Sequence, residues 1–216
     1  MLKVDHITIG YGDRLLVRDI SFELAPGECV LLAGANGTGK TTLLSWLASG
    51  PEAAIVLIPT NIPKVKGFTV ESFIHTGCYR ESDWRGRISE EVARTMEETL
   101  DVLGIQELKG RDIATLSDGE FQKACLATGL TRRAEVLLLD EPTAHLDVEN
   151  RIDVLRTLRE VARKTGTAVL FSSHDLHDAL PEVDRVFVLT RDGRFLASGP
   201  DDKEAVLQAA FPNFNR

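Results

Sequence analysis

The stretch CVLLAGANGTGKTTLLSWLA, Cys29–Ala48, decides the fold. It opens with an apolar run typical of a strand that is buried on both faces, and it closes with a helical segment that Gly50–Pro51 ends. The loop between them, GANGTGKT at Gly34–Thr41, matches the pattern G-x-x-x-x-G-K-[ST]. Because strand, loop and helix follow in the required order, this stretch predicts a nucleotide-binding site.

Each residue type in this loop has a physical task. Glycines let the backbone bend so that its amides face a β-phosphate, and Lys40 can bridge the β- and γ-phosphates. The hydroxyl of Thr41 is placed to ligate Mg²⁺. We therefore predict a bound nucleotide and Mg²⁺, held by Gly34, Asn36, Gly37, Thr38, Gly39, Lys40, Thr41 and Thr42.

The segments around this loop predict an α/β fold. Leu2–Tyr11 and Leu15–Leu24 alternate apolar and polar residues around a turn, which indicates an antiparallel hairpin. Further apolar runs and helical segments alternate as in a parallel sheet. They are the predicted strands AIVLIP (54–59), VLLLD (136–140), AVLF (168–171) and RVFVLT (185–190), and the predicted helix at Val148–Lys164.

The stretch from Val65 onward has a different character. It shows helical periodicity, with Ile88, Val92, Met96 and Leu100 in step, and no strong strand. We predict one domain: residues 1–64 and 131–216 form the sheet core, and residues 65–130 form a helical subdomain inserted into it.

Two carboxylates follow the run VLLL. Asp140 falls at the carboxyl end of a buried strand, where open α/β sheets bind ligands, so we expect it to hold the Mg²⁺ shell through water. Glu141 comes next and can take a proton from an attacking water molecule. The alternative is a pair of acids that are merely solvated at a strand end.

His174 occupies a similar position on another strand. In AVLFSSHD an apolar run is followed by small polar residues and then this histidine. A lone histidine is often structural, but its place just beyond a core strand favours a contact with the γ-phosphate.

Composition excludes several classes of protein. A formal net charge of −8 argues against broad nucleic-acid binding. The N-terminus lacks the apolar region of a signal peptide, and no run is long enough to span a membrane. Cys29 and Cys125 lie in apolar surroundings without metal-binding spacing, so we expect them to be small core residues in a reducing compartment.

A second glycine turn stands at LSDGE, Leu116–Glu120, at the start of an amphipathic segment. A serine there can simply cap a helix, or it can help the helix N-terminus to hold an anion. In this order of motifs, LSDGE resembles the LSGGQ signature of the nucleotide-binding subunit of ATP-binding cassette (ABC) transporters. The resemblance implies a P-loop NTPase core and covers nearly the whole chain.

The resemblance also implies where the signature acts. In that family two subunits pair head to tail, and each signature loop closes on the partner's γ-phosphate; here this part falls to Ser117, Asp118, Gly119 and Glu120. Tyr11 matches the aromatic residue that stacks on adenine, although it could be an ordinary surface tyrosine. Asp147 matches the D-loop at the dimer interface, and His174 matches the switch histidine.

The chain departs from the family pattern at three places. Where the family has a glutamine after the strand 54–59, this chain has Thr60 and Asn61, whose side chains are shorter. Only 19 residues, positions 41 to 59, separate Lys40 from Thr60, so the usual hairpin beside the nucleotide is expected to be trimmed. In the signature, Asp118 and Glu120 replace glycine and glutamine.

The segment GFTVESFIHTGCYR, 67–80, resembles importers for iron–siderophore, haem and cobalamin. The resemblance implies a cytoplasmic ATPase, peripheral on the inner face of the cell membrane, that forms a homodimer through two ATP molecules. Its partners would be separate transmembrane permease subunits, with or without a substrate-binding protein, and no nucleic acid. Two alternatives remain open: a soluble ABC ATPase that acts in a protein assembly, and a degenerate module that binds nucleotide without turnover.

Overall fold

The computed structural model describes residues 1–12, 14–50, 54–78, 88–212 and 214. Within these residues the strands are β1 (Leu2–Tyr11), β2 (Arg14–Leu24), β3 (Cys29–Gly34), β4 (Ile55–Ile58), β5 (Val136–Leu139), β6 (Ala168–Ser172), β7 (Arg185–Leu189) and β8 (Phe195–Ala197). The helices are α1 (Lys40–Ala48), α2 (Val70–Gly77), α3 (Glu90–Val102), α4 (Asp118–Thr131), α5 (Val148–Thr165), α6 (Leu176–Ala179) and α7 (Lys203–Ala210).

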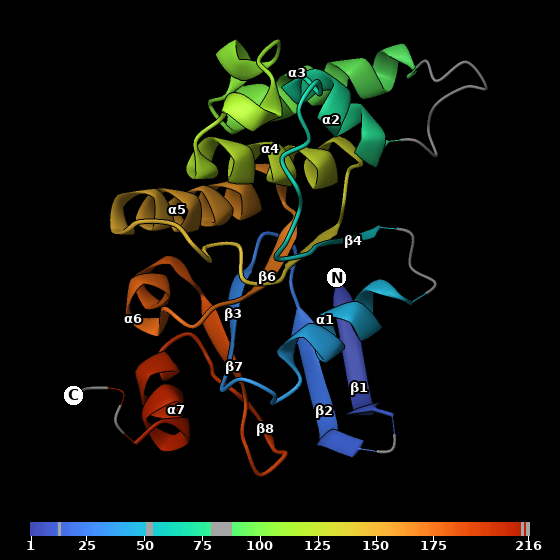
Figure 1. The fold of residues 1–216 in the computed structure, drawn as a ribbon. Coiled ribbons are helices and arrows are strands. Elements are labelled where there is room, and N and C mark those ends of the chain that lie inside the picture. The colour runs from blue at the N-terminus through green and yellow to red at the C-terminus, as the bar shows by residue number, and fades with distance from the viewer. Residues whose placement is uncertain (13, 51–53, 79–87, 213, 215–216) are drawn as a thin grey trace.

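The central sheet has six strands in the order β4-β5-β6-β3-β7-β8. All neighbouring pairs are parallel except β7 and β8, and β1 and β2 form a separate antiparallel pair (Figure 1). This confirms the predicted α/β class, with a mainly parallel sheet and an antiparallel N-terminal part. Strand β3, which leads into the glycine-rich loop, lies in the middle of the sheet.

The two faces of the sheet belong to different hydrophobic clusters. Leu31 and Ala33 of β3 pack in a cluster with residues of α2, α3, α4 and α5. Val30 and Leu32 point to the other face, where α1 and the hairpin β1–β2 cover them. Because both faces are covered, every residue of β3 is buried, which explains its continuous apolar run.

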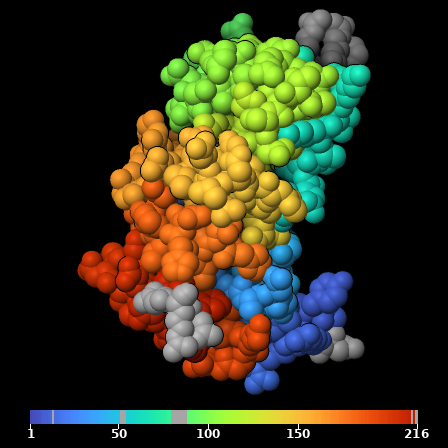
Figure 2. Space-filling view, turned by 60° about the vertical axis from the view of Figure 1, so that its left-hand side comes forward, coloured from blue at the N-terminus to red at the C-terminus, as the bar shows by residue number. Residues whose placement is uncertain are grey.

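The segment between β4 and β5 is helical within its described part. It contains α2, α3 and α4, together with an isolated β bridge between Thr69 and Asp112. Helices α2 and α3 lie at one end of the molecule, opposite α7 and the hairpin (Figure 2). The end of the motif 67–80, Tyr79–Arg80, lies outside the described residues. The division into core and helical subdomain stays a prediction, because α4 shares a core with the sheet.

The connection between α1 and β4, where the family has a hairpin, is short. Helix α1 ends at Ala48 and β4 begins at Ile55, which leaves six residues, 49–54, of which 51–53 lie outside the described set. The prediction of a shortened connection beside α1 therefore agrees with the bounds of both elements.

Apolar burial also fits the expectations for the cysteines. Cys29 and Cys125 are free and buried, and burial raises the pKa of the Cys125 thiol to about 12. None of the helices in the described part of the chain is long and apolar enough to cross a bilayer.

Candidate nucleotide site

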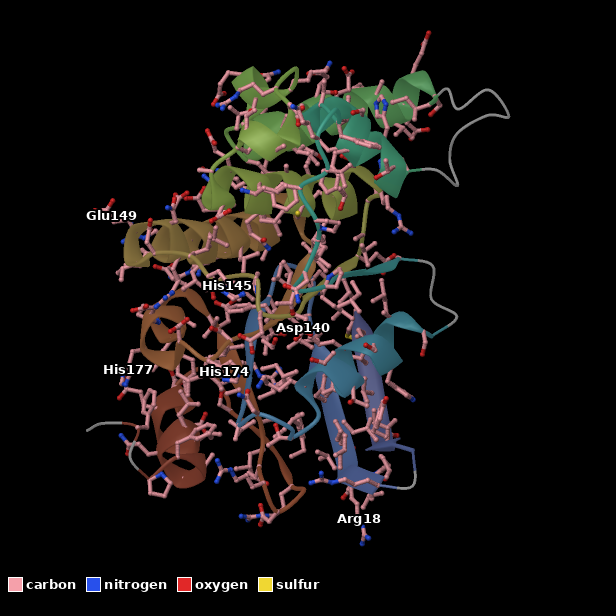
Figure 3. The ribbon with its side chains drawn as sticks, viewed as in Figure 1. Arg18, Asp140, His145, Glu149, His174 and His177 are labelled. Atoms are coloured by element: carbon pink, nitrogen blue, oxygen red, sulfur yellow. The ribbon has the colours of Figure 1, made fainter. Side chains whose placement is uncertain are left out.

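Three strand ends meet at the centre of the sheet. Strand β6 lies between β5 and β3, and all three are parallel, so their carboxyl ends share one edge. The glycine-rich loop follows β3, Asp140 and Glu141 follow β5, and His174 lies two residues beyond β6. Figure 3 shows Asp140 and His174 near each other in the middle of the molecule. Ligands bind at such an edge in open α/β sheets.

The loop itself requires glycine at two positions for different reasons. Gly34 has no space for a side chain, because a Cβ there would lie 2.6 Å from Thr38 Oγ1 and 2.9 Å from the Leu189 carbonyl oxygen. Gly39 caps α1 with a φ of 105°, in the left-handed region, and packs against Ile9 of the hairpin. Thr38 closes the turn by donating its hydroxyl to the Ala35 carbonyl oxygen at 2.9 Å. The loop thus curls back over the end of β3.

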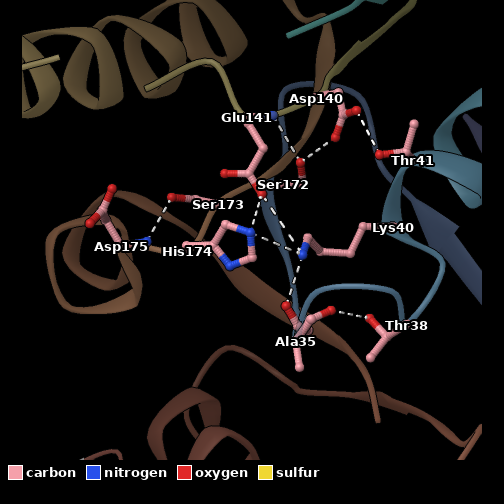
Figure 4. Close-up of polar contacts among 11 residues, drawn as sticks. Ala35, Thr38, Lys40, Thr41, Asp140, Glu141, Ser172, Ser173, His174 and Asp175 are labelled. Atoms are coloured by element: carbon pink, nitrogen blue, oxygen red, sulfur yellow. Dashed lines mark hydrogen bonds and ion pairs between the residues drawn. The ribbon is translucent and has the colours of Figure 1, made fainter. Parts of the chain in front are cut away.

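Lys40 lies inside this curl. Only 7% of its surface is exposed, and its Nζ donates to the Gly34 carbonyl oxygen at 2.8 Å (Figure 4). The same Nζ is 3.8 Å from Glu141 Oε1. Burial lowers the pKa of Lys40, although the carboxylates of Glu141 and Asp140 oppose that shift. A buried ammonium with acceptors on two sides suits a site for a polyanion.

A chain of hydrogen bonds joins the loop to both carboxylates. Thr41 donates its hydroxyl to Asp140 Oδ2 at 2.7 Å, and Ser172 donates to Asp140 Oδ1 at 2.8 Å. The Ser172 oxygen in turn accepts the backbone N–H of Glu141 at 2.9 Å. Ser172 therefore fixes the directions of both acids from the neighbouring strand. Sequence reasoning missed it, although small polar residues after an apolar run were the available signal.

Glu141 and His174 form a pair. His174 Nε2 lies 3.0 Å from Glu141 Oε1 and 3.5 Å from Lys40 Nζ. Glu141 has a φ of 51°, an uncommon backbone conformation for a residue with a side chain, and such strain concentrates at functional sites. The structure thus brings Lys40, Glu141 and His174 into mutual contact.

The other residues predicted to bind nucleotide surround this cluster. Asn36 and Gly37 are exposed at the tip of the loop, and Thr42 is half-buried in the first turn of α1. Tyr11 ends β1 with 80% of its surface exposed. A Cβ on Gly39 would lie 3.2 Å from Ile9 Cδ1, so the strand that ends with this exposed tyrosine packs beside the loop.

The signature residues form a capped helix start. Ser117 is the N-cap of α4: its hydroxyl accepts the Glu120 N–H at 3.2 Å, while its own N–H donates to Glu120 Oε2 at 2.8 Å. These two bonds make a capping box, a motif that can have either glutamate or glutamine at the position of Glu120. Asp118 pairs instead with Lys64 Nζ at 2.6 Å. Both expected roles of Ser117, cap and anion site, are compatible with this geometry.

Asn150, a residue that sequence reasoning missed, lies between Gly119 and Asp147 of the D-loop. A Cβ on Gly119 would lie 2.8 Å from Asn150 Oδ1. The Asn150 amide donates to Asp147 Oδ2 at 2.9 Å, and Asp147 Oδ1 caps α5 by accepting the Asn150 N–H at 2.8 Å. Asp147 therefore holds Asn150 against the signature turn.

Thr60 and Asn61 follow β4 by two and three residues. The carbonyl oxygen of Ile58, the last residue of β4, accepts the N–H of Asp140 at 3.0 Å, so the strand ends beside the carboxylates. Thr60 and Asn61 line a groove together with residues of α4 and of the D-loop, including His145. The segment that replaces the glutamine thus lies between the sheet edge and the signature helix.

One edge of the sheet carries a phosphate loop, a buried lysine, two carboxylates and a histidine. This arrangement is that of a nucleotide-hydrolysing protein of the P-loop type. Comparison with known proteins identifies its family. A sequence model of the ABC transporter family matches residues 17–144, more than half of the chain. The chain belongs to the ABC transporter family, and it is an ATPase domain of that family, whose general activity is ATP hydrolysis.

Individual relatives agree with this assignment. The zinc import ATP-binding protein ZnuC of Cereibacter sphaeroides is 34% identical over 205 residues, covering 88% of this chain and 79% of its own. The iron(3+)-hydroxamate import ATP-binding protein FhuC of Bacillus subtilis is 29% identical over 200 residues, covering 82% and 74%. A solved structure of a protein assigned to the metal-chelate type of ABC transporter, in an inward-facing conformation, superposes with a TM-score of 0.85 at 22% identity, covering 97% and 88%.

Proposed function

We propose that this chain hydrolyses ATP to drive a membrane importer for iron–siderophore, haem or cobalamin. Two copies would close on two ATP molecules, and closure would pull on separate permease subunits. Relatives named for iron-hydroxamate and zinc import support the import of a metal or its chelate. The observation that carries the proposal is the contact of Lys40, Glu141 and His174 at the end of the phosphate loop.

The chemistry follows from these three residues. Water attacks the γ-phosphorus, a new P–O bond forms, and the bond to the β–γ bridging oxygen breaks, so ADP leaves. Glu141 takes the proton from the attacking water, and His174, whose Nε2 lies 3.0 Å from Glu141 Oε1, stands beside the carboxylate. Lys40 carries positive charge to the phosphate oxygens from a dry site, where an ion contributes more than it does in water.

Mg²⁺ fits the donor set beside the loop. The hydroxyl of Thr41 and the carboxylate of Asp140 are hard oxygen ligands, and they already lie within hydrogen-bond distance of each other. The ion would supply positive charge to the phosphates. Ser172 would hold Asp140 in place through its bond to Oδ1.

The second half of each site comes from the partner copy in this proposal. The N-terminus of α4 carries partial positive charge, and Ser117, Gly119 and the adjacent amides would approach the partner's γ-phosphate. Asp147 would lie at the same interface, and Tyr11 would stack on adenine. Thr60 or Asn61 would take over the place of the family's glutamine, directly or through a water molecule.

The expected location is peripheral, on the inner face of the cell membrane, where the permease would hold the chain. A substrate-binding protein on the other side is compatible with the import relatives. Nucleic acid is not an expected partner, because the net charge of −8 repels a polyanion outside a local site.

The Glu141→Gln variant tests the proposal. It should bind MgATP, lose turnover by ~100-fold or more, and accumulate as a closed dimer, measured by light scattering after size exclusion. Glu149→Gln, which changes an exposed acid at the start of α5, is the matched control and should behave as the parent chain. A tagged Glu141→Gln chain should also recover a polytopic protein from membranes. A Glu141→Gln chain that stays monomeric in MgATP, or that recovers no membrane protein, would contradict the proposal.

A further inference from the structure

The connection from β4 to α2 makes a contact with the signature turn that no motif explains. Lys64, four residues after Thr60, reaches the start of α4 with its side chain 26% exposed. Its Nζ donates to the Leu116 carbonyl oxygen at 2.9 Å and to Asp118 Oδ1 at 2.6 Å. The same ammonium lies 5.3 Å from the ring centroid of Phe121, which adds a cation–π contact. One side chain thus contacts Leu116 and Asp118 of the signature turn and Phe121 directly after it.

Asp118 creates an electrostatic difficulty that Lys64 relieves. Its carboxylate follows Ser117 directly and is 66% exposed. A negative charge in the first turn stabilises the helix itself, yet it repels an anion that approaches the same turn. The other acid of this turn, Glu120, already has partners, since Ser117 N–H binds it and Arg111 Nη1 lies 3.6 Å from it. Each acid of the signature turn therefore has its own cation.

We propose that Lys64 is a positioning residue for the signature turn. It neutralises Asp118 and turns that carboxylate toward the connection after β4, so that Ser117 and the α4 amides can receive the partner's γ-phosphate. This inference rests on the proposed function, because the phosphate in question belongs to the second copy. Lys64 also joins the segment after the sheet edge to the signature turn, so the two parts of the composite site are held in one arrangement.

A purely structural role for Lys64 predicts something different. The capping box of Ser117 and Glu120 starts α4 without help from Lys64. If Lys64 acts by neutralisation, its loss should do harm only while Asp118 keeps its charge. If it acts as a tether alone, removing the charge of Asp118 should be as harmful as removing Lys64.

The experiment measures the concentration at which the Glu141→Gln chain, taken as the parent, and four further variants of it dimerise in MgATP. Lys64→Met should raise it about tenfold, because a threefold loss at each of two equivalent contacts multiplies. Lys64→Met/Asp118→Asn should restore the parent value, and Asp118→Asn alone should dimerise at least as well as the parent. Lys66→Met, which removes an exposed lysine of the same connection, is the matched control and should have no effect.

Two further readings keep the outcomes separable. MgATP affinity of the monomer should be equal in all variants, because the phosphate loop is untouched. Urea unfolding should show that every variant is folded, because the capping box still starts α4. An unchanged dimer in Lys64→Met, or a loss that Asp118→Asn does not restore, would overturn the role of Lys64 and leave the proposed function standing. A Glu141→Gln chain that fails to dimerise with Lys64 and Asp118 intact would overturn both.

Discussion

The phosphate-loop cluster and the signature turn, each of which we propose to hold a phosphate, are built in opposite ways. In the cluster, Lys40, Thr41 and the residues after β5 and β6 point at one another across three strand ends. In the signature turn, Ser117 and Glu120 bind each other within one helix start. In the part of the chain that the structure describes, no hydrogen bond or ion pair joins the two groups.

The difference indicates which part we expect to need a second chain. The cluster contains a cation, a carboxylate placed to act as a base, and oxygens that suit a metal ion, so its proposed chemistry converges inside one copy. The signature turn has hydrogen-bond donors but no catalytic base beside it, and its acids are already paired with Lys64 and Arg111. Changes in the cluster should therefore alter how a single copy binds or hydrolyses ATP, whereas changes in the signature turn should leave ATP binding by the single copy unchanged and act only in pairs.

The largest effect is expected from Lys40→Met. The substitution removes the buried ammonium that we expect to contact the phosphates. Their charge is then uncompensated, so MgATP affinity should fall by about 30-fold to 1000-fold. Calorimetric titration of the purified chain measures it, with Lys164→Met, at an exposed ion pair on α5, as the control. A MgATP affinity within a few-fold of that of the parent chain would contradict a role for Lys40 in binding the phosphates.

Ser172→Ala should lower turnover by about tenfold while MgATP affinity changes by no more than about threefold. The substitution removes one bond to Asp140 and leaves the Glu141 N–H without its acceptor, a cost of about 1–3 kcal/mol in the orientation of the two acids. Ser173→Ala is the comparison, since Ser173 binds only the Asp175 N–H among these residues. Steady-state hydrolysis at saturating ATP decides it; equal turnover in both variants contradicts the role of Ser172.

Gly119→Ala sharpens the comparison from the signature side. The new Cβ would meet Asn150 Oδ1 at 2.8 Å and force Asn150 away from Asp147. In a Glu141→Gln background we expect dimerisation in MgATP to weaken by about fivefold to tenfold, with single-chain ATP affinity unchanged. Gly110→Ala, where a Cβ meets nothing within 4 Å, is the control. Weaker ATP binding by the monomer would mean that the signature turn acts within its own chain.

A smaller effect is expected from pH. Because burial lowers the pKa of Lys40 from its ordinary value of 10.5, the folded chain loses this positive charge at a lower pH than an exposed lysine does. MgATP affinity should therefore decline by a few-fold as pH rises from about 7.5 to 10, and Lys40→Arg should stay flat over that range. Fluorescent-nucleotide titrations measure both chains, and parallel curves would contradict the shifted pKa.

Much of the fold could be predicted because the central strands of the sheet are short apolar runs. Every residue of β3, β5 and β6 is buried on both faces, and such runs stand out in a sequence. The order of the strands could not be read in the same way, since it depends on how chain segments cross over the sheet. That order sets β6 between β3 and β5, and so brings Ser172 and His174 to Asp140 and Glu141.

The contacts that were missed belong to residues without a motif. Lys64 stands in an irregular connection, and its partner Asp118 is 54 positions further along the chain. Asn150 looks like an ordinary residue in the first turn of α5 until the bond to Asp147 and the contact with Gly119 are known. Long-range pairs of this kind depend on how α4 and α5 pack, which local sequence patterns do not encode.

The most direct test of the central claim mixes two inactive chains. The Lys40→Met chain has a disabled phosphate loop and an intact signature turn. The Ser117→Arg chain has an intact phosphate loop and a disabled signature turn. In a head-to-tail dimer the mixed pair contains one complete site, so hydrolysis should return to about a quarter of the parent rate when the chains exchange at random. Activity in the mixture no higher than the sum of the separate variants, under conditions where the parent chain turns over, would contradict a site shared between two copies.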